Sequence, residues 1–211
     1  MSDLKLPRLY AIADAQVLAT RGVAVVDFAR ELRAAGVTLI QYRDKTGSPQ
    51  EILRAAAILR EAFAGSGARL IMNDRADLAV LAGFDGVHVG QDDLSPEDAR
   101  TVIGPGRIIG VSTHSDAQVR AADASCADYI AIGPIFETGT KENPDPVVSL
   151  EGIRRARALT SKPLVAIGGI TRENARSVIE AGADSVAIIS ALIATGETVE
   201  QVVRDFLSIL G

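Results

Sequence analysis

Several features that would define a class of protein are missing from this sequence. Its 211 residues include one cysteine, Cys126, which permits neither an intramolecular disulfide framework nor a multi-cysteine metal site. Lys and Arg total 22 against 27 Asp and Glu, and the net charge of −5 does not suit the basic face of a general nucleic-acid-binding protein. We therefore expect no nucleic-acid partner.

Membrane and export signals are equally scarce. No uninterrupted apolar run approaches the roughly 18 residues that a membrane-spanning helix needs. Residues 1–8 include Lys5 and Arg8 but no apolar segment typical of a secretory signal. No linker, charge block or low-complexity tract divides the chain. We therefore predict a single domain over residues 1–211, cytoplasmic and without a membrane partner.

What the sequence does contain is a repeat of short apolar runs, each followed by a segment with helical character. Eight runs rich in Ile, Val, Leu and Ala recur about every 25 residues, a spacing that fits a strand, a loop and a short helix. Crossovers of this kind require parallel strands. The predicted strands are residues 8–14, 39–44, 70–74, 86–90, 108–113, 129–135, 164–170 and 185–191.

The segments between the runs carry helix signals. Residues 23–35 place apolar side chains at a spacing of three to four, which gives one apolar face. Ser48-Pro49 is typical of a helix start, with proline at the first helical position. Further helices are predicted to begin at residue 171 and at about residue 199.

Eight alternating units at this length favour an α/β fold, a single-domain (βα)8 barrel of the TIM-barrel class. A doubly wound open sheet is the alternative. That fold normally carries a glycine-rich phosphate-binding turn after its first strand, whereas the sequence after Asp14 reads Ala-Gln-Val-Leu.

The active site of such a barrel lies at the carboxyl ends of its strands, so the polar residues there are candidates. Gln41, Arg43 and Lys45 share one face of the second strand while it stays extended. If Ile40 and Tyr42 face the helices, those three point to the barrel axis, where their burial is costly without an anionic ligand. The alternative is that Arg43 pairs with Asp44 or with another carboxylate on the rim.

The third and fourth strands end in carboxylates. Asp74 follows Asn73, and Asp93 lies shortly after the fourth strand. Carboxylates at adjacent strand ends can approach one another, and Mg²⁺ typically takes one or two carboxylates plus substrate phosphates. A helix cap is the alternative for Asn73 and Asp74, and a capping or solvated carboxylate is the alternative for Asp92 and Asp93. His88, between two valines, is more typical of a core histidine than of a ligand.

The remaining strand ends offer groups for an anion. Ser112 and Thr113 supply hydroxyls that either contact a ligand or start the next helix. Residues 138–141, Thr-Gly-Thr-Lys, suit a phosphate or diphosphate but lack the Walker spacing. Gly168 and Gly169 let backbone amides approach an anion, and the last two loops are the usual phosphate site of these barrels. Tight packing is the alternative for Gly168.

These strand-end motifs resemble those of the thiamine-phosphate synthase family, in order and over nearly the whole chain. The resemblance implies an enzyme of thiamine biosynthesis, a transferase that joins a hydroxymethylpyrimidine diphosphate to a thiazole phosphate and releases diphosphate. Two positions depart from the usual pattern, Tyr42 where Leu is common and Glu137 where Pro is common. The motifs are residues 41–45, 73–77, 86–93, 110–114, 133–141, 166–170 and 189–190.

The resemblance also implies roles for individual residues. One Mg²⁺ per subunit would be bound by Asp74 and Asp93. The implied catalytic groups are Arg43, Lys45, Ser112 and Lys141. Contacts to the pyrimidine diphosphate would come from Gln41, Tyr42, Arg43, Asp44, Lys45, Asn73, Ser112 and Lys141. Contacts to the thiazole phosphate, carboxylated or not, would come from Thr138, Gly139, Thr140, Gly169, Ile189 and Ser190.

Two rival functions stay open at this point. A thiazole tautomerase of the same fold would isomerise the thiazole phosphate with a histidine such as His114 as acid–base, but it has no need of Asp74, Asp93, Arg43 and Lys141 together. The other rival is a non-catalytic, ligand-sensing regulator. Release of diphosphate from the two substrates distinguishes both from a synthase. The sequence leaves the oligomeric state open, a homo-oligomer included.

Overall fold

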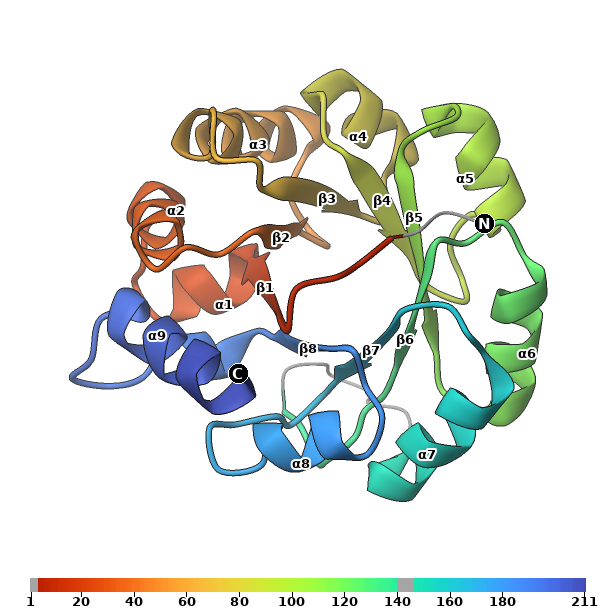
Figure 1. Ribbon diagram of the computed structural model, residues 1–211. Coiled ribbons are helices and arrows are strands. Elements are labelled where there is room, and N and C mark those ends of the chain that lie inside the picture. Colours follow the sequence, from red (N-terminus) through yellow and green to blue (C-terminus); the bar gives the residue numbers. More distant parts are fainter. Residues whose placement is uncertain (1–3, 140–145) are drawn as a thin grey trace.

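The computed structural model describes residues 4–139 and 146–211. Within these ranges, eight parallel strands form one closed barrel in chain order, and the helices surround it (Figure 1). This confirms the predicted (βα)8 barrel and excludes the open sheet. The strands are β1 (Leu9–Asp14), β2 (Leu39–Arg43), β3 (Arg69–Asn73), β4 (Gly86–Val89), β5 (Ile108–Thr113), β6 (Tyr129–Ile132), β7 (Leu164–Ile167) and β8 (Ser185–Ile188).

The first βα unit contains two helices where the sequence predicted one. The additional helix follows β1 directly, because the Asp14 carboxylate accepts a hydrogen bond from the Val17 amide at 2.9 Å and caps it. The helices are α1 (Ala15–Thr20), α2 (Val25–Ala34), α3 (Pro49–Ala62), α4 (Ala76–Ala82), α5 (Pro96–Ile103), α6 (Asp116–Ala124), α7 (Ser149–Leu159), α8 (Ala175–Glu180), the 3₁₀ helix η1 (Ser190–Leu192) and α9 (Val199–Leu210). None in the described ranges is long and apolar enough to cross a membrane.

Helix starts follow the local capping chemistry. Ser48 and Glu51 form a reciprocal capping box at the start of α3, where the Ser-Pro pair predicted it. The prediction of a helix start at residue 171 was wrong. There the Thr171 amide donates to the Asn174 side chain at 2.8 Å and closes a turn, so that α8 begins only at Ala175.

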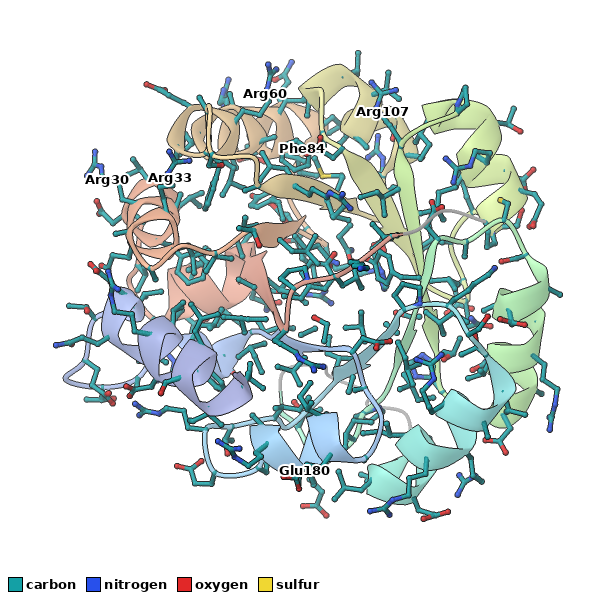
Figure 2. The ribbon with its side chains drawn as sticks, viewed as in Figure 1. Arg30, Arg33, Arg60, Phe84, Arg107 and Glu180 are labelled. Carbon is teal, nitrogen blue, oxygen red and sulfur yellow. The ribbon has the colours of Figure 1, made fainter. Side chains whose placement is uncertain are left out.

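Side chains along each strand alternate between the helices and the barrel axis. Ile40 and Tyr42 lie in the hydrophobic cluster under the helices, whereas Leu39 belongs to the cluster inside the barrel. Gln41 therefore points inward, as predicted from its parity. The inner cluster consists of Tyr10, Ile12, Leu39, Ile71, Tyr129, Ala131, Val165 and Ala187. Figure 2 shows side chains filling the barrel and the space beneath the helices.

The amino end of the barrel is closed by the chain itself. Leu4 and Leu6 pack against the inner cluster, and the segment before β1 runs across this end in Figure 1. A cavity of about 950 Å³ lies beside it and is lined in part by Phe84 and Arg107. Both side chains are labelled in Figure 2. Three aspartates near strand starts accept backbone hydrogen bonds from the preceding strand: Asp85 from Leu70 at 2.7 Å, Asp128 from Ile109 at 2.8 Å and Asp184 from Leu164 at 2.8 Å.

The last three strands are shorter than predicted. They end at Ile132, Ile167 and Ile188, and the following residues leave the ladder toward the carboxyl face. After β7 the cause is Gly168 and Gly169, whose positive φ angles of 100° and 65° are incompatible with an extended strand. The carboxyl face is therefore built from irregular segments on a rigid barrel, which is where these folds place their chemistry.

Candidate active site

Two carboxylates meet at the carboxyl ends of β3 and β4. Asp74 adopts a left-handed backbone, with φ of 59°, which Asp tolerates better than most residues. Its carboxyl group forms an ion pair with Lys45, from the loop after β2, and a hydrogen bond with Asp93, from the loop after β4. Asp93 also accepts a hydrogen bond from the Gly90 amide at 2.8 Å. Three loops thus converge on one small charged cluster.

The environment separates the acidities of the two carboxyl groups. Burial raises the pKa of Asp74, and its contact with Asp93 acts in the same direction, against the effect of Lys45. Burial also acts to raise the pKa of Asp93, but the hydrogen bonds from Asp74 and the Gly90 amide outweigh it and the pKa is lowered. When the pair carries one proton, Asp74 therefore holds it more readily than Asp93 does.

This donor set fits a magnesium ion that is completed by a ligand. Two carboxyl groups in hydrogen-bond contact repel each other when both are ionised, and a divalent cation relieves that repulsion. Among the described residues, no group of three or more His, Cys, Asp or Glu side chains is arranged to hold a metal. Mg²⁺ commonly binds through one or two carboxylates, with waters and substrate phosphates supplying the other oxygens.

Arg43 also has a carboxylate partner, but it is not its sequence neighbour. Its guanidinium pairs with Asp14, which lies directly opposite in the register of β1 and β2. Asp14 is only 2% exposed and caps α1 as well, so its charge is held by two separate contacts. Sequence reasoning missed Asp14. The available signal was a carboxylate at the end of the strand that neighbours the one carrying Arg43.

Tyr42 and Asp44 stand apart from the groups on the barrel axis. Tyr42 is buried against the helices, and its hydroxyl donates to Asp44 at 3.3 Å. The other carboxylate oxygen of Asp44 accepts from the Thr46 and Gly47 amides at 3.1 and 2.7 Å. Asp44 therefore shapes the loop that carries Lys45, and the structure does not bring either residue to the carboxylate pair.

Asn73 is buried beside Asp74 with an unused hydrogen-bond donor. Within the described ranges, its Nδ2 atom is the one buried side-chain nitrogen or oxygen without a partner. A buried, unsatisfied donor is unfavourable, and such groups in native proteins usually have a reason. Capping is not the reason, since α4 has Arg75 at its N-cap position and no side-chain cap. A ligand acceptor atom at this point would satisfy the Asn73 amide.

Beneath the charged cluster, a continuous chain of hydrogen bonds crosses the barrel interior. Gln41 Nε2 donates to the Tyr10 hydroxyl at 2.8 Å, and the Tyr10 and Tyr129 hydroxyls are 3.0 Å apart. The Tyr129 hydroxyl is 2.9 Å from His88 Nδ1, and His88 Nε2 is 2.8 Å from Ser112 Oγ. Burial raises the pKa of both tyrosines, so both phenols stay protonated. His88 is thus the bonded core histidine that the sequence favoured.

The hydroxyl at Ser112 is not used to start a helix. The N-cap of α6 is Ser115, whose side chain accepts from the Gln118 amide at 3.3 Å. Thr113, next to Ser112 on β5, faces the other way and donates to the carbonyl of Ala131 at 2.9 Å. Ser112 therefore lies on the barrel axis with the other candidate ligands.

Residues expected around the thiazole phosphate lie in the segments after β6, β7 and β8. Thr138 and Gly139 follow β6, whereas Thr140 and Lys141 lie outside the described residues. Ile189 follows β8 directly, and Ser190 is the first residue of η1. A Cβ on Gly169 would lie 2.5 Å from the carbonyl oxygen of Glu137.

The two glycines after β7 also have a packing role. A Cβ on Gly168 would lie 2.6 Å from the Cβ of Pro134, so the segments after β6 and β7 touch closely. The Phe136 amide donates to the Gly168 carbonyl at 3.0 Å. The tight-packing alternative for Gly168 therefore holds, and it extends to Gly169. Glycine at these positions is not by itself a sign of phosphate binding.

The comparisons with known proteins agree with one another. Residues 9–192 match the family model described as thiamine monophosphate synthase. The thiamine-phosphate synthase of Koribacter versatilis is 57% identical over 211 residues, covering 99% of this chain and 98% of the relative. That of Methanoculleus marisnigri is 44% identical over 189 residues, covering 90% and 89%. The solved thiamine phosphate pyrophosphorylase from Pyrococcus furiosus superimposes with a TM-score of 0.85 at 33% identity, covering 96% and 95%.

Proposed function

This chain belongs to the thiamine monophosphate synthase family and is a transferase, and from that premise we propose the reaction it catalyses. It couples 4-amino-2-methyl-5-hydroxymethylpyrimidine diphosphate with 4-methyl-5-(2-phosphoethyl)thiazole, or its carboxylated form, to give thiamine phosphate and diphosphate. The observation that carries the proposal is the convergence of Asp74, Asp93 and Lys45 at one end of the barrel. Such a cluster suits a diphosphate with its magnesium ion.

The leaving diphosphate is the group that most needs stabilisation. Asp74 and Asp93 would hold one Mg²⁺, which would neutralise charge on the diphosphate oxygens. Arg43 and Lys45 bring two cations to the same rim. The Lys45 side chain is 48% exposed and flexible, so its ammonium can exchange Asp74 for a phosphate oxygen. Charges placed in advance lower the barrier because they need little reorganisation as the bond breaks.

The pyrimidine ring is proposed to lie over the barrel axis. Asn73 offers its unsatisfied amide donor, and Gln41 and Ser112 offer an amide and a hydroxyl from β2 and β5. The bond between the methylene carbon and the diphosphate oxygen breaks, and its electron pair leaves with the diphosphate. The amino group of the pyrimidine delocalises the positive charge on the methylene, and the thiazole nitrogen lone pair forms the new bond. This reaction needs no covalent nucleophile from the protein.

The thiazole phosphate is proposed to bind across the segments after β6, β7 and β8. Its contacts are expected from Thr138, Gly139, Gly169, Ile189 and Ser190, which all belong to those segments. Phosphate sites of this fold commonly form at the last two loops. The roles of Thr140 and Lys141, as a thiazole contact and a diphosphate cation, stay predictions from the sequence.

The isomerase alternative depends on a histidine acting as acid and base. The His114 ring places Nδ1 against the Gly133 carbonyl, and its backbone amide donates to Gln118 at 2.6 Å. An isomerase of the thiazole phosphate alone would make no use of the Asp74–Asp93 pair. The charged cluster therefore favours the coupling reaction over isomerisation.

The proposal is tested by identifying the product. Purified protein is incubated with Mg²⁺ and both substrates, and thiamine phosphate is sought by chromatography and mass spectrometry while diphosphate is assayed separately. We expect both products in equal amounts, and neither when either substrate is omitted. Diphosphate release from the pyrimidine substrate alone, or an altered thiazole phosphate without coupling, would contradict the proposal.

A further inference from the structure

The chain of hydrogen bonds inside the barrel has a direction. The amide nitrogen of Gln41 can only donate, so the Tyr10 oxygen accepts from it. Within the part of the chain that the structure describes, the other partner of the Tyr10 hydroxyl is Tyr129. The Tyr10 proton is therefore donated to Tyr129, because a buried hydroxyl proton without an acceptor is unfavourable.

The same reasoning fixes the protonation of His88. The Tyr129 hydroxyl accepts from Tyr10 and lies 2.9 Å from His88 Nδ1. Its proton goes to Nδ1, which must then carry no hydrogen. A neutral imidazole with bare Nδ1 has its proton on Nε2, and that proton is donated to Ser112 Oγ at 2.8 Å. The hydroxyl proton of Ser112 is then directed away from His88.

The barrel is shaped to hold this arrangement. Gly110 on β5 lies against the tip of Tyr129, and a Cβ on that glycine would be 2.0 Å from the ring carbon that bears the hydroxyl. The His88 and Tyr129 rings stack at 5.5 Å between centroids. Tyr10 and Tyr129 are 1% and 0% exposed, so water does not compete for their hydroxyls. The two tyrosine hydroxyls are therefore shielded from water, a condition in which a hydrogen bond is strong.

We propose that His88 is a positioning residue that acts through Ser112. As the Nε2–H tautomer it donates to Ser112 Oγ, and so makes the Ser112 hydroxyl a donor toward an acceptor atom of the pyrimidine diphosphate. This inference rests on the proposed function, which places that substrate against Ser112. A donor aimed at an oxygen or nitrogen that gains negative charge strengthens as the leaving group departs. Tyr10 on β1 and Tyr129 on β6 set the tautomer through the Nδ1 side of the ring.

The tautomer is measured directly on the unaltered, substrate-free protein. The chain has two histidines, so ¹⁵N-histidine labelling gives two imidazole spin systems in a long-range ¹H–¹⁵N correlation spectrum. His114→Gln assigns them. His114 Nδ1 faces the Gly133 carbonyl, which only accepts, so that ring must be protonated at Nδ1 and serves as an internal reference. We expect His88 to be neutral at pH 7, with its proton on Nε2.

Kinetics then test whether the chain acts through Ser112. Ser112→Ala and Tyr129→Phe are each expected to lower kcat of coupling about tenfold, the scale of one hydrogen bond. In the double variant, Tyr129→Phe should cause no further loss, because the group through which it acts is gone. Thr113→Val is the matched control. It removes a buried, bonded hydroxyl from the adjacent position of β5 and should leave kcat unchanged.

The outcomes separate this inference from the proposed function. A His88 proton on Nδ1, an imidazolium at pH 7, or additive losses from Ser112→Ala and Tyr129→Phe would overturn the positioning role. If Tyr129→Phe does not fold, Tyr10→Phe takes its place in the comparison with Ser112→Ala and the double variant. It removes an earlier hydroxyl of the chain and keeps the ring. Absence of coupling by the unaltered protein would instead overturn the proposed function, and the tautomer measurement does not depend on it.

Discussion

The carboxylate of Asp14, which ends β1, forms an ion pair with the guanidinium of Arg43, which ends β2. The two residues are 29 positions apart in the chain but opposite each other in the barrel. Because Asp14 is buried and also holds the start of α1, it is a fixed point on which the cation can be oriented. The rim of the site is therefore braced by the first strand as well as by the strands that carry its ligands.

The effect of the Asp14 charge on Arg43 can be tested separately from the role of Asp14 as the cap of α1. Asp14→Asn keeps a side chain that caps helices well but removes the charge facing Arg43. We expect a folded protein whose kcat/KM for the pyrimidine diphosphate falls roughly 10- to 100-fold, because a displaced cation misaligns the leaving group. Steady-state kinetics and circular dichroism provide the measurement. Asp27→Asn, which removes a carboxylate from the exposed pair with Arg30, is the control and should be neutral.

The carboxylate pair predicts how activity depends on metal. Asp74→Ala and Asp93→Ala should each slow coupling at least ~10²-fold and weaken its dependence on Mg²⁺ concentration, since metal stabilisation of a leaving group is worth several kcal/mol. Asp92→Ala removes an exposed neighbouring carboxylate and should have little effect. Full coupling by the double variant, or by the unaltered protein in excess chelator, would refute the metal assignment.

Removing the Asp74 charge, which should lower activity, should instead raise the free energy of unfolding of the metal-free protein. Burial, reinforced by Asp93, raises the pKa of Asp74 in the folded protein. A raised pKa stabilises the fold below the unfolded value of about 3.9, and that contribution disappears as pH rises through the folded pKa. Asp74→Asn should therefore gain stability relative to the unaltered protein as pH rises. Denaturant unfolding in chelator over a pH series checks this, and a difference that is constant or shrinks with rising pH would contradict it.

The close contact at Gly169 predicts a severe effect of one methyl group. Gly169→Ala must accommodate both a φ of 65° and a carbonyl oxygen 2.5 Å away. Gly196→Ala is the matched control, with a φ of 81° and nothing within 4 Å, and should cost about 1–2 kcal/mol of left-handed strain alone. Thermal unfolding should show the larger loss at Gly169.

Titration calorimetry extends the comparison to the two substrates. Thiazole-phosphate binding should weaken in Gly169→Ala, while the pyrimidine diphosphate, held by groups from other loops, should still bind. Equal losses of stability in the two glycine variants would mean that the segment after β6 shifts at little cost to make room for the methyl group, and would contradict the predicted clash. Loss of the pyrimidine diphosphate alone from folded Gly169→Ala would mean that the two sites are assigned the wrong way round.

The sequence predicted the features that depend on short-range patterns. The order of the eight strands, the inward parity of Gln41 and the start of α3 at Ser48-Pro49 all follow from spacing and local chemistry. The meeting of Asp74 with Asp93 follows from parallel strands ending at one face. Such features need no knowledge of which side chains touch across the barrel.

Features that depend on contacts between distant strands were not predictable in this way. The partner of Arg43 proved to be Asp14, because register rather than sequence proximity decides which carboxylate is near. The donor-to-acceptor direction of the hydrogen bonds through Tyr10 and Tyr129 can be assigned only when five side chains from five strands have been placed. The early end of β7 results from the positive φ angle at Gly168. A glycine in the sequence permits such an angle but does not require it.

The central claim is that the strand-end carboxylates and cations form a magnesium-dependent site for a diphosphate. Titration of the pyrimidine diphosphate into the unaltered protein, by calorimetry with Mg²⁺ and then with excess chelator, tests it most directly. We predict binding at least about tenfold tighter with Mg²⁺, and loss of that difference in Asp93→Ala but not in Asp92→Ala. Equal affinity with and without Mg²⁺ in the unaltered protein would contradict the claim.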